Sequence, residues 1–408
     1  MSLLTLARSR TTELTGAAAV ATVAAMIGVL FAGSTLITPL YVIYQKEWGF
    51  SRITLTLIYA AYVVGNLAAL LVFGRLSDRI GRRRTAVPVM AVAIVSALVF
   101  LLANGVSWLY AGRILSGLAV GVGTATATAW LAELIAEEGN ARATRIATIT
   151  NFLGLGIAAL IAGLLAQYAP WPLRLSFVLY LTTLLVVLLP ILRTQETVSR
   201  PAKRLGDVPL RPRIAVPRAI RLQFVAPAVT GFGAMALVGF YAALAPSILA
   251  ENLHETSHAV AGALFFELAC VVAATIALTQ RLSSRAAMLS ALVLMTPSVV
   301  LIAASQVLGA MALMIAATAM CAVAAGLGYR GSLQVVNEIA PADRRAEVLA
   351  SYLICVFCGN ALPVIGIGVI STLTSPITAS LTFSAMIIVC ALAALAFGIK
   401  GRSASRVR

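Results

Sequence analysis

Long apolar stretches alternate with short polar ones along the whole chain. We count twelve apolar stretches of about 20 residues, the length with which an α-helix crosses the hydrocarbon core of a bilayer. Short segments of strictly alternating polarity, which are typical of a transmembrane β-barrel, do not recur along the chain. The pattern predicts an all-α membrane protein with spans near 17–44, 51–73, 85–104, 108–133, 146–168, 173–192, 221–249, 258–279, 286–305, 309–333, 348–371 and 376–398.

Composition agrees with a lipid environment. Hydrophobic residues make up 61% of the 408 positions, and the mean hydropathy is +0.99. Soluble domains of this length are less apolar and would have to expose many of these side chains to water. We therefore expect an integral membrane protein.

The net charge of +16 is distributed unevenly between the two sides of the predicted membrane. If the N-terminus is cytoplasmic, 25 of the 30 Lys and Arg residues fall on the cytoplasmic side, in both tails and in alternate loops. This asymmetry sets topology, so it predicts two cytoplasmic termini and contact with anionic lipid, and it argues against nucleic acid as a partner. The ratio of 27 Arg to 3 Lys suggests a bacterial source, hence the inner membrane.

A polar segment divides the chain into two parts of six spans each. Residues 193–220 contain four prolines and seven Lys or Arg, which excludes a membrane span and indicates an exposed cytoplasmic linker. The predicted organisation is an N-terminal six-helix bundle (1–192), the linker (193–220) and a C-terminal six-helix bundle (221–408).

The two parts share sequence features at nearly constant offset. Internal repeats of this kind recur in secondary transporters, where the substrate site lies between the repeats. The matching pairs are RLSDR at 75–79 with RLSSR at 281–285, AELIAEEGNAR at 132–142 with NEIAPADRR at 337–345, Gly156 with Gly359, and Gly163 with Gly366.

The stretch GRLSDRIGRRRT at 74–85 resembles the signature of the loop between spans two and three in the major facilitator superfamily. The resemblance implies two six-helix bundles related by a pseudo-two-fold axis, and transport by alternating access. It also implies a conformational latch at the cytoplasmic face, in which Asp78 acts near the start of the eleventh span. The residues of this predicted latch are Gly74, Asp78, Gly81, Arg82, Arg344 and Arg345. A topology anchor with a capped turn is the alternative interpretation.

The stretch LYAGRILSG at 109–117 resembles the fourth-span pattern of the same superfamily, with Ser116 in place of the usual Gln. The resemblance implies that Arg113 takes part in proton or charge coupling. Because an arginine does not release a proton near neutral pH, its role would be to tune a nearby acid. The alternative is a packing arginine that donates to backbone carbonyls.

Glu267 is an acid about ten residues into the predicted eighth span, close to the midplane. A carboxylate without compensation in such a place tends to take up a proton, which is the property that proton coupling requires. We therefore predict that Glu267 carries protons or meets a cationic substrate. The alternatives are a structural ion pair with Arg113 or Arg330, or a protonated acid that donates a hydrogen bond.

Other polar residues in the spans suggest a gate and a substrate cavity. A cytoplasmic gate is predicted from Glu133, Arg330 and Glu338, although Arg330 could instead meet an anionic substrate. Interhelical hydrogen bonds are the alternative for the predicted cavity residues. These are Tyr41, Tyr62, Asn66 and Tyr241. Pro39 and Pro246, at similar places in spans one and seven, predict helix kinks.

Nothing in the sequence predicts an enzyme or a cofactor, because no nucleotide-binding loop, metal-ligand helix or nucleophile motif is found. His254 and His258 have the spacing of two metal ligands on a helix, but we interpret them, with Glu251 and Glu255, as an exposed loop end.

The few fixed charges in the spans favour proton-coupled export of a small lipophilic or amphipathic compound. We expect the transporter to be a monomer. Ala159-Leu160 occupies the fifth-span position where drug/proton antiporters carry Gly-Pro, which argues against antiport. The rival hypothesis is uptake or facilitated exchange of a polar or anionic metabolite. A hypothesis of another class is a non-transporting membrane sensor or assembly factor.

Overall fold

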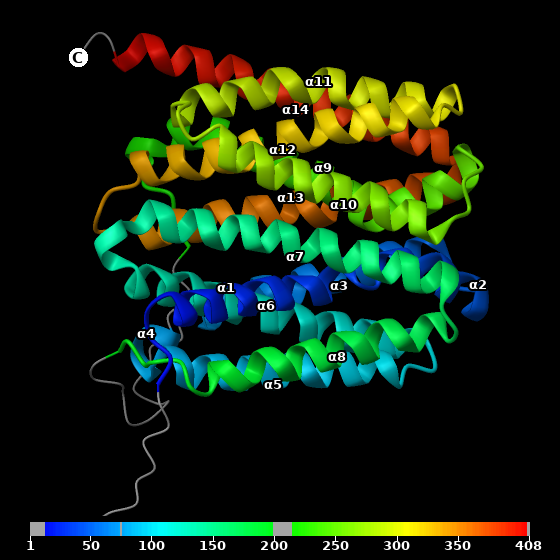
Figure 1. Ribbon diagram of the computed structural model, residues 1–408. Helices are drawn as coiled ribbons and strands as arrows, with labels where there is room; N and C mark the ends of the chain where they lie inside the picture. Colours follow the sequence, from blue (N-terminus) through cyan, green and yellow to red (C-terminus); the bar gives the residue numbers. More distant parts are fainter. Residues whose placement is uncertain (1–12, 74–75, 199–213, 406–408) are drawn as a thin grey trace, which may run out of the picture.

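The computed structural model describes residues 13–73, 76–198 and 214–405, and these residues are almost entirely helical (Figure 1). One isolated parallel bridge joins Leu14 to Thr194. The helices, in chain order, are α1 (Gly16–Thr35), η1 (Thr38–Leu40), α2 (Tyr41–Trp48), α3 (Arg52–Phe73), α4 (Leu76–Ile80), α5 (Arg82–Leu101), α6 (Val106–Leu134), η2 (Ala136–Glu138), α7 (Asn140–Tyr168), α8 (Pro172–Ile191), η4 (Arg218–Ile220), α9 (Arg221–Asn252), α10 (His258–Leu278), α11 (Ser284–Val307), α12 (Met311–Ile339), α13 (Arg345–Leu373) and α14 (Pro376–Ser405).

Within the described ranges, twelve helical segments are long and apolar enough to cross a membrane, which confirms the predicted all-α protein with twelve spans. The first span combines α1, η1 and α2, and runs from Gly16 to Trp48. Several helices extend beyond the predicted apolar runs. The fifth span begins at Ala141 rather than at 146, because a helix satisfies its own backbone groups in the polar interface as well as in lipid.

The helices lie side by side with roughly aligned axes, and the first six spans lie next to the last six (Figure 1). We call residues 13–198 the N-terminal half and residues 214–405 the C-terminal half. Between the halves, α7 packs against α10 and α3 packs against α13. Span five therefore meets span eight, and span two meets span eleven, as a pseudo-two-fold axis between two six-span repeats requires. That each half moves as a separate bundle stays a prediction.

Small residues bring α7 and α10 close together. A Cβ atom added to Gly163 would lie 3.1 Å from the Cα of Gly262, and one added to Gly156 would lie 2.7 Å from the Cβ of Ala269. Such small residues allow two membrane helices to approach closely. Their repeat partners have other surroundings: Gly359 packs on Phe232 in its own half, and a Cβ on Gly366 would meet open space.

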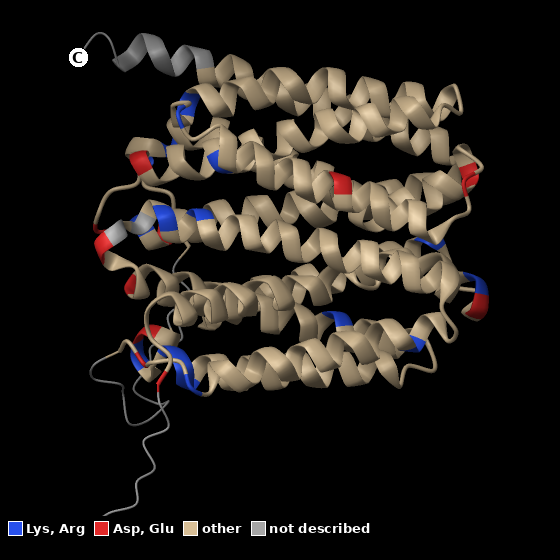
Figure 2. Ribbon diagram, in the orientation of Figure 1, with Lys and Arg blue, Asp and Glu red and all other residues tan. Residues whose placement is uncertain are grey.

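The two ends of the bundle differ in charge. We call the end that carries residues 193–198 and 214–220 the linker end, and the opposite end the far end. Lys and Arg gather at the linker end, and fewer lie at the far end (Figure 2). This is the asymmetry that the sequence predicts.

The first span is interrupted near its middle. α1 ends at Thr35, and the 3-10 turn η1, which contains Pro39, separates it from α2. Proline has no amide hydrogen to donate, so it leaves a carbonyl near the end of α1 without its usual partner. By contrast, α9 continues through Pro246 as one helix.

Candidate functional site

At the far end, an ion pair joins the two halves. Arg52, the first residue of α3, donates to the carboxylate of Glu251 near the end of α9 and to the hydroxyl of Ser371 in α13. The side chains of Arg52 and Glu251 are 32% and 37% exposed, so the pair lies at the surface of the bundle. We call these three residues the far-end clasp.

Further contacts between the halves lie deeper in the bundle. The hydroxyl of Tyr59 in α3 donates to Oδ1 of Asn360 in α13 at 2.9 Å, and both groups are buried. A Cβ added to Gly368 would collide with Thr56, so α3 and α13 are in close contact here as well. The far end is therefore closed by contacts between α3 and α13.

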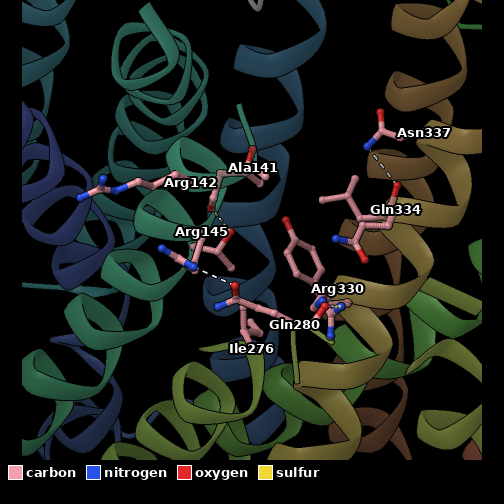
Figure 3. Close-up of a pocket in the computed structure, with 12 residues that line it drawn as sticks. Ala141, Arg142, Arg145, Ile276, Gln280, Arg330, Gln334 and Asn337 are labelled. Atoms are coloured by element: carbon pink, nitrogen blue, oxygen red, sulfur yellow. Dashed lines mark hydrogen bonds between the residues drawn. The ribbon is translucent and has the colours of Figure 1, made fainter. Parts of the chain in front are cut away.

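At the linker end, a cavity of about 580 Å³ lies between the halves (Figure 3). One wall is the first turns of α7, and the other is formed by the end of α10 and by one face of α12. A volume of this size is in the range of small-molecule sites. The cavity is lined by Ala141, Arg142, Thr144, Arg145, Thr148, Ile276, Gln280, Tyr329, Arg330, Leu333, Gln334 and Asn337.

Helical periodicity explains why these residues share one space. In α7 the lining positions 141, 144, 145 and 148 follow the spacing of one helix face, as do 330, 333, 334 and 337 in α12. Three of the lining residues are arginines, and among the described residues that line the cavity none is acidic. The cavity is therefore polar and positively charged.

Two of the three arginines interact with neutral oxygen atoms. Arg145 donates to Oε1 of Gln280 at 2.7 Å, which links α7 to the turn after α10 (Figure 3). Arg330 donates to the carbonyl oxygens of Thr279, Gln280 and Leu282. These carbonyls follow the C-terminus of α10, where a cation is favourable because the helix dipole is negative there.

Arg113 is fully buried in the N-terminal half, with 0% of its surface exposed. Its guanidinium donates to the carbonyl of Ser34 at the end of α1 and to the carbonyl of Tyr59 in α3. It also lies over the rings of Tyr59 and Tyr62, at 5.2 and 4.8 Å from the ring centres. Arg113 thus satisfies a carbonyl at the interruption of the first span, as the packing alternative predicts.

The predicted ion pairs of Glu267 do not form in this structure. Within the described residues Glu267 has no hydrogen bond and no ion pair, while Arg113 and Arg330 donate to carbonyls. Glu267 also precedes the cavity residue Ile276 by nine positions, about two and a half helical turns, so it lies on the opposite face of α10. A role in coupling stays a prediction.

The four predicted cavity residues are buried and do not line the linker-end cavity. Tyr62 lies beneath Arg113, Asn66 packs against Gly121 of α6, and Tyr241 accepts a hydrogen bond from Thr318. In the described part of the chain, the hydroxyl of Tyr41 and Nδ2 of Asn66 have no hydrogen-bond partner. Contacts of these residues with substrate stay predictions.

The predicted latch is satisfied within the N-terminal half in this structure. Asp78 forms an ion pair with Arg82, and Arg82 also pairs with Glu133 at 2.6 Å. On the other side, Arg344 pairs with Glu347 at 2.8 Å, three residues along its own segment. Asp78 does not contact the start of α13 in this conformation, because Arg82 is a closer partner within its own half, and its role as a latch in an outward-facing state stays a prediction.

The other three residues of the predicted latch are Gly74, Gly81 and Arg345. Gly74 lies outside the described residues. Gly81 has a φ angle of 116°, which favours glycine, and it begins the turn into α5 as predicted. Arg345 is exposed at the first position of α13.

The predicted gate residues do not meet one another. Glu133 pairs with Arg82 and accepts from Thr197, Arg330 binds the carbonyls after α10, and Glu338 accepts from Ser284 at 2.6 Å. Their expected ionic contacts are therefore absent among the described residues. Each of the three side chains instead forms an ion pair or hydrogen bonds with a neighbouring segment of its own half or with the start of the linker.

Sequence reasoning missed several residues that the structure brings together. Arg52 fell at the start of a predicted span and Glu251 was assigned to an exposed loop end, and no sequence pattern links two charges in different halves. Arg145 and Gln280 were also missed, although the polar stripe of α7 at helical spacing was a signal for a solvated face. For the two histidines, the described residues contain no group of three or more side chains that could hold a metal ion.

Twelve spans in two similar halves, with a cavity between the halves at one end, are typical of secondary membrane transporters. The sequence model of the Major Facilitator Superfamily matches residues 23–362, and the chain belongs to this family. This makes the protein an integral membrane transporter and not an enzyme. None of the curated proteins compared with the chain matches it.

Solved structures share the fold at low sequence identity. A bacterial homolog of the human lysosomal transporter Spinster, in an inward-facing and occupied conformation, has a TM-score of 0.72 and 15% identity, covering 94% of this chain and 96% of that chain. A point mutant of the nucleoside transporter NupG has a TM-score of 0.71 and 13% identity, covering 93% and 99%. The unoccupied inward-facing form of the Spinster homolog has a TM-score of 0.68 and 16% identity, covering 93% and 95%.

Proposed function

We propose that the protein carries a small polar solute across the membrane by alternating access between its two halves. One observation carries this proposal: the halves are joined at the far end by the clasp and by Tyr59 with Asn360, while at the linker end a cavity lies between them, spanned by the hydrogen bond from Arg145 to Gln280. Rocking of the halves would break the far-end contacts and close the cavity.

We further propose that the linker end faces the cytoplasm of a bacterial cell, with the protein in the inner membrane as a monomer surrounded by lipid. The gathering of Lys and Arg at this end supports the orientation, because positively charged loops are retained in the cytoplasm (Figure 2). In this orientation the structure corresponds to the inward-open state.

The lining of the cavity favours a polar solute over a lipophilic one. Nine of the twelve lining residues carry polar or charged side chains, and the three others are Ala141, Ile276 and Leu333. A lipophilic compound would leave these polar groups unpaired, which costs free energy. This observation reverses the order of the two hypotheses that the sequence suggests, while the direction of transport is left to experiment.

Proton coupling through Glu267 belongs to the same proposal, although its place on α10 opposite the cavity favours an indirect role. Glu267 has no hydrogen-bonding partner in the described residues. A change in its protonation would therefore act through the packing of α10 on its neighbours rather than through contact with the solute.

Distance measurements between pairs of labels, one label on each half, test alternating access directly. One pair at Glu47 and Thr256 reports the separation of the halves at the far end, and a second pair at Glu137 and Asp343 reports it at the linker end. All four positions are in exposed segments. Alternating access predicts two populations in which the two distances change in opposite senses. Distances that stay constant under all solute and pH conditions would support the sensor or assembly-factor hypothesis.

Proteoliposomes with an imposed pH gradient and a lumenal pH reporter test coupling. Wild type and Glu267→Gln are compared while candidate solutes are added one at a time. Solute-dependent proton movement in wild type alone would support Glu267 as the coupling acid, and the sign of the movement separates antiport from symport. Equal solute flux in both proteins without proton movement would leave facilitated exchange.

A further inference from the structure

The linker-end cavity presents positive charge from both halves of the protein. Arg145 belongs to α7 in the N-terminal half, and Arg330 belongs to α12 in the C-terminal half (Figure 3). The two side chains line the same cavity from opposite walls. Since the described lining residues include no acid, their mutual repulsion is not cancelled within the cavity.

The partners of these arginines leave their charge uncompensated. Arg145 donates to an amide oxygen of Gln280, and Arg330 donates to backbone carbonyls and to the hydroxyl of Thr279. Within the described residues neither guanidinium forms an ion pair with a carboxylate. Hydrogen bonds to neutral oxygens satisfy donors, but they do not neutralise a charge, and a carboxylate or phosphate makes a stronger bond to the same donors.

Two acids at this end of the bundle have partners outside the cavity lining. Glu133 pairs with Arg82 and accepts from Thr197, both outside the cavity lining. Glu338 follows the lining residue Asn337, but it accepts from Ser284 of α11. The positive charge inside the cavity is thus a property of the folded protein and not only of the basic loops around it.

Neutral groups complete a site for an anion. Gln334 provides an amide donor, and the amide groups of Gln280 and Asn337, which donate to the carbonyls of Ala277 and Leu333, each keep a second hydrogen. The ring of Tyr329 forms part of the wall, where it packs edge-on against Phe152 with ring centres 6.5 Å apart. The volume of about 580 Å³ accommodates a small metabolite. Amide donors and an aromatic wall suit a solute with an anionic group and a short organic body.

We propose that the cavity binds a small anionic solute, with a carboxylate or a phosphate monoester between Arg145 and Arg330, and that the bound anion permits the linker end to close. This inference rests on the proposed alternating-access function. Without the anion, two cations on opposite halves oppose closure. With the anion between them, the same two residues attract one ligand from both sides, which lowers the free energy of the closed linker end.

Binding is measured with two probes, inorganic phosphate and succinate, on the full-length protein in nanodiscs of zwitterionic lipid. Arg145→Gln and Arg330→Gln are each expected to weaken binding about tenfold, and Arg145→Lys, which keeps the charge, about threefold or less. The matched control is Arg281→Gln, which removes an exposed arginine at the same end outside the cavity lining. Absence of binding of both probes to wild type, or equal losses in the control, overturns the proposal.

Closure is measured with the labels at Glu137 and Asp343. Addition of the probe that binds is expected to shorten this linker-end distance in wild type but not in Arg145→Gln. Binding should also weaken as ionic strength rises, because salt screens the charges. A probe that binds with no change in distance overturns the closure part of the inference.

The outcomes separate this inference from the proposed function. If the label distances at the two ends alternate while neither anion binds, alternating access holds and the anion site fails. If an anion binds to wild type but not to Arg145→Gln, and no distance changes, the site holds and alternating access fails. Loss of phosphate binding in nanodiscs that contain phosphatidylglycerol would assign the site to a lipid headgroup and overturn the free solute.

Discussion

At the far end of the bundle a cation of one half meets an acid of the other, whereas at the linker end cations from both halves line a cavity without an acid. Arg52 and Glu251 hold the far end together across the gap between α3 and α9. Arg145 donates to the neutral amide oxygen of Gln280 in the other half, and Arg330 donates to backbone carbonyls of its own half. Charge of the same sign on both walls favours separation, and an ion pair favours contact.

The sign of a few charges at the two ends is thus sufficient to favour an open linker end over an open far end. Because exposed ion pairs contribute little each, we expect the free-energy difference between the two open ends to be small enough for a solute to shift it. The clasp residues also lie in segments that the sequence places at the ends of spans.

The largest effect should come from a steric change at the closed end. Gly368→Val would force a side chain into Thr56 of α3, because even a Cβ collides there. We expect the far end to open in most molecules and solute flux to fall about tenfold or more. The label pair at Glu47 and Thr256 measures the opening. Gly366→Val on the same helix is the control, since a Cβ at Gly366 meets open space; equal effects would disprove the steric account.

Removal of the buried cation should have the next largest effect. Arg113→Gln would leave the carbonyls of Ser34 and Tyr59 without their donors near the interruption of the first span. We expect a loss of stability of roughly 2–3 kcal/mol, visible as a lower midpoint of thermal unfolding in detergent. Arg174→Gln, at an exposed far-end position, is the control and should leave the midpoint nearly unchanged. A midpoint equal to wild type would show that Arg113 is not needed for packing.

Charge reversal tests the clasp itself. Arg52→Glu would place two carboxylates opposite each other and open the far end by about 1–2 kcal/mol, with a corresponding rise in the open population. The double variant Arg52→Glu with Glu251→Arg restores opposite charges and is expected to return the distance distribution toward wild type. If the double variant behaves like the single one, the pair does not hold the far end closed.

The smallest effect is expected from one hydroxyl group. Tyr59→Phe removes the bond to Asn360 that joins the halves below the clasp. We expect the far end to open by about 1 kcal/mol, roughly a fivefold change in the equilibrium between the two states. Tyr110→Phe in α6 provides a matched change at a partly buried tyrosine in the N-terminal half. A wild-type distribution for Tyr59→Phe would show that the buried bond does not contribute to the closed far end.

Much of the fold could be predicted because a bilayer restricts the choices of a chain. In an apolar run such as 258–279, backbone groups in lipid must be hydrogen-bonded within the segment. Its helix and its approximate ends therefore follow from hydrophobicity and length. The interruption at Pro39 was predicted as a kink for the same reason, since the loss of a backbone donor is a local property.

The candidate site was predicted less well, because its residues are neighbours only in three dimensions. Glu267 attracted attention as a lone acid in a span, but the rotation of α10 turns it away from the cavity. Glu133 was assigned to the predicted gate and Arg82 to the predicted latch, but in the structure the two form an ion pair. A charge in a sequence shows that a partner is needed, but the partner depends on how helices are rotated and packed.

By itself the sequence determined the twelve spans, the basic linker end and the family, because span length, charge asymmetry and the loop signature are local in the chain. Only the tertiary structure decided that Arg52 meets Glu251, that Arg145 and Arg330 line one cavity, and that Arg113 is bound to carbonyls. These contacts join residues of different helices, and their free energies depend on distance and on burial, which no linear pattern contains.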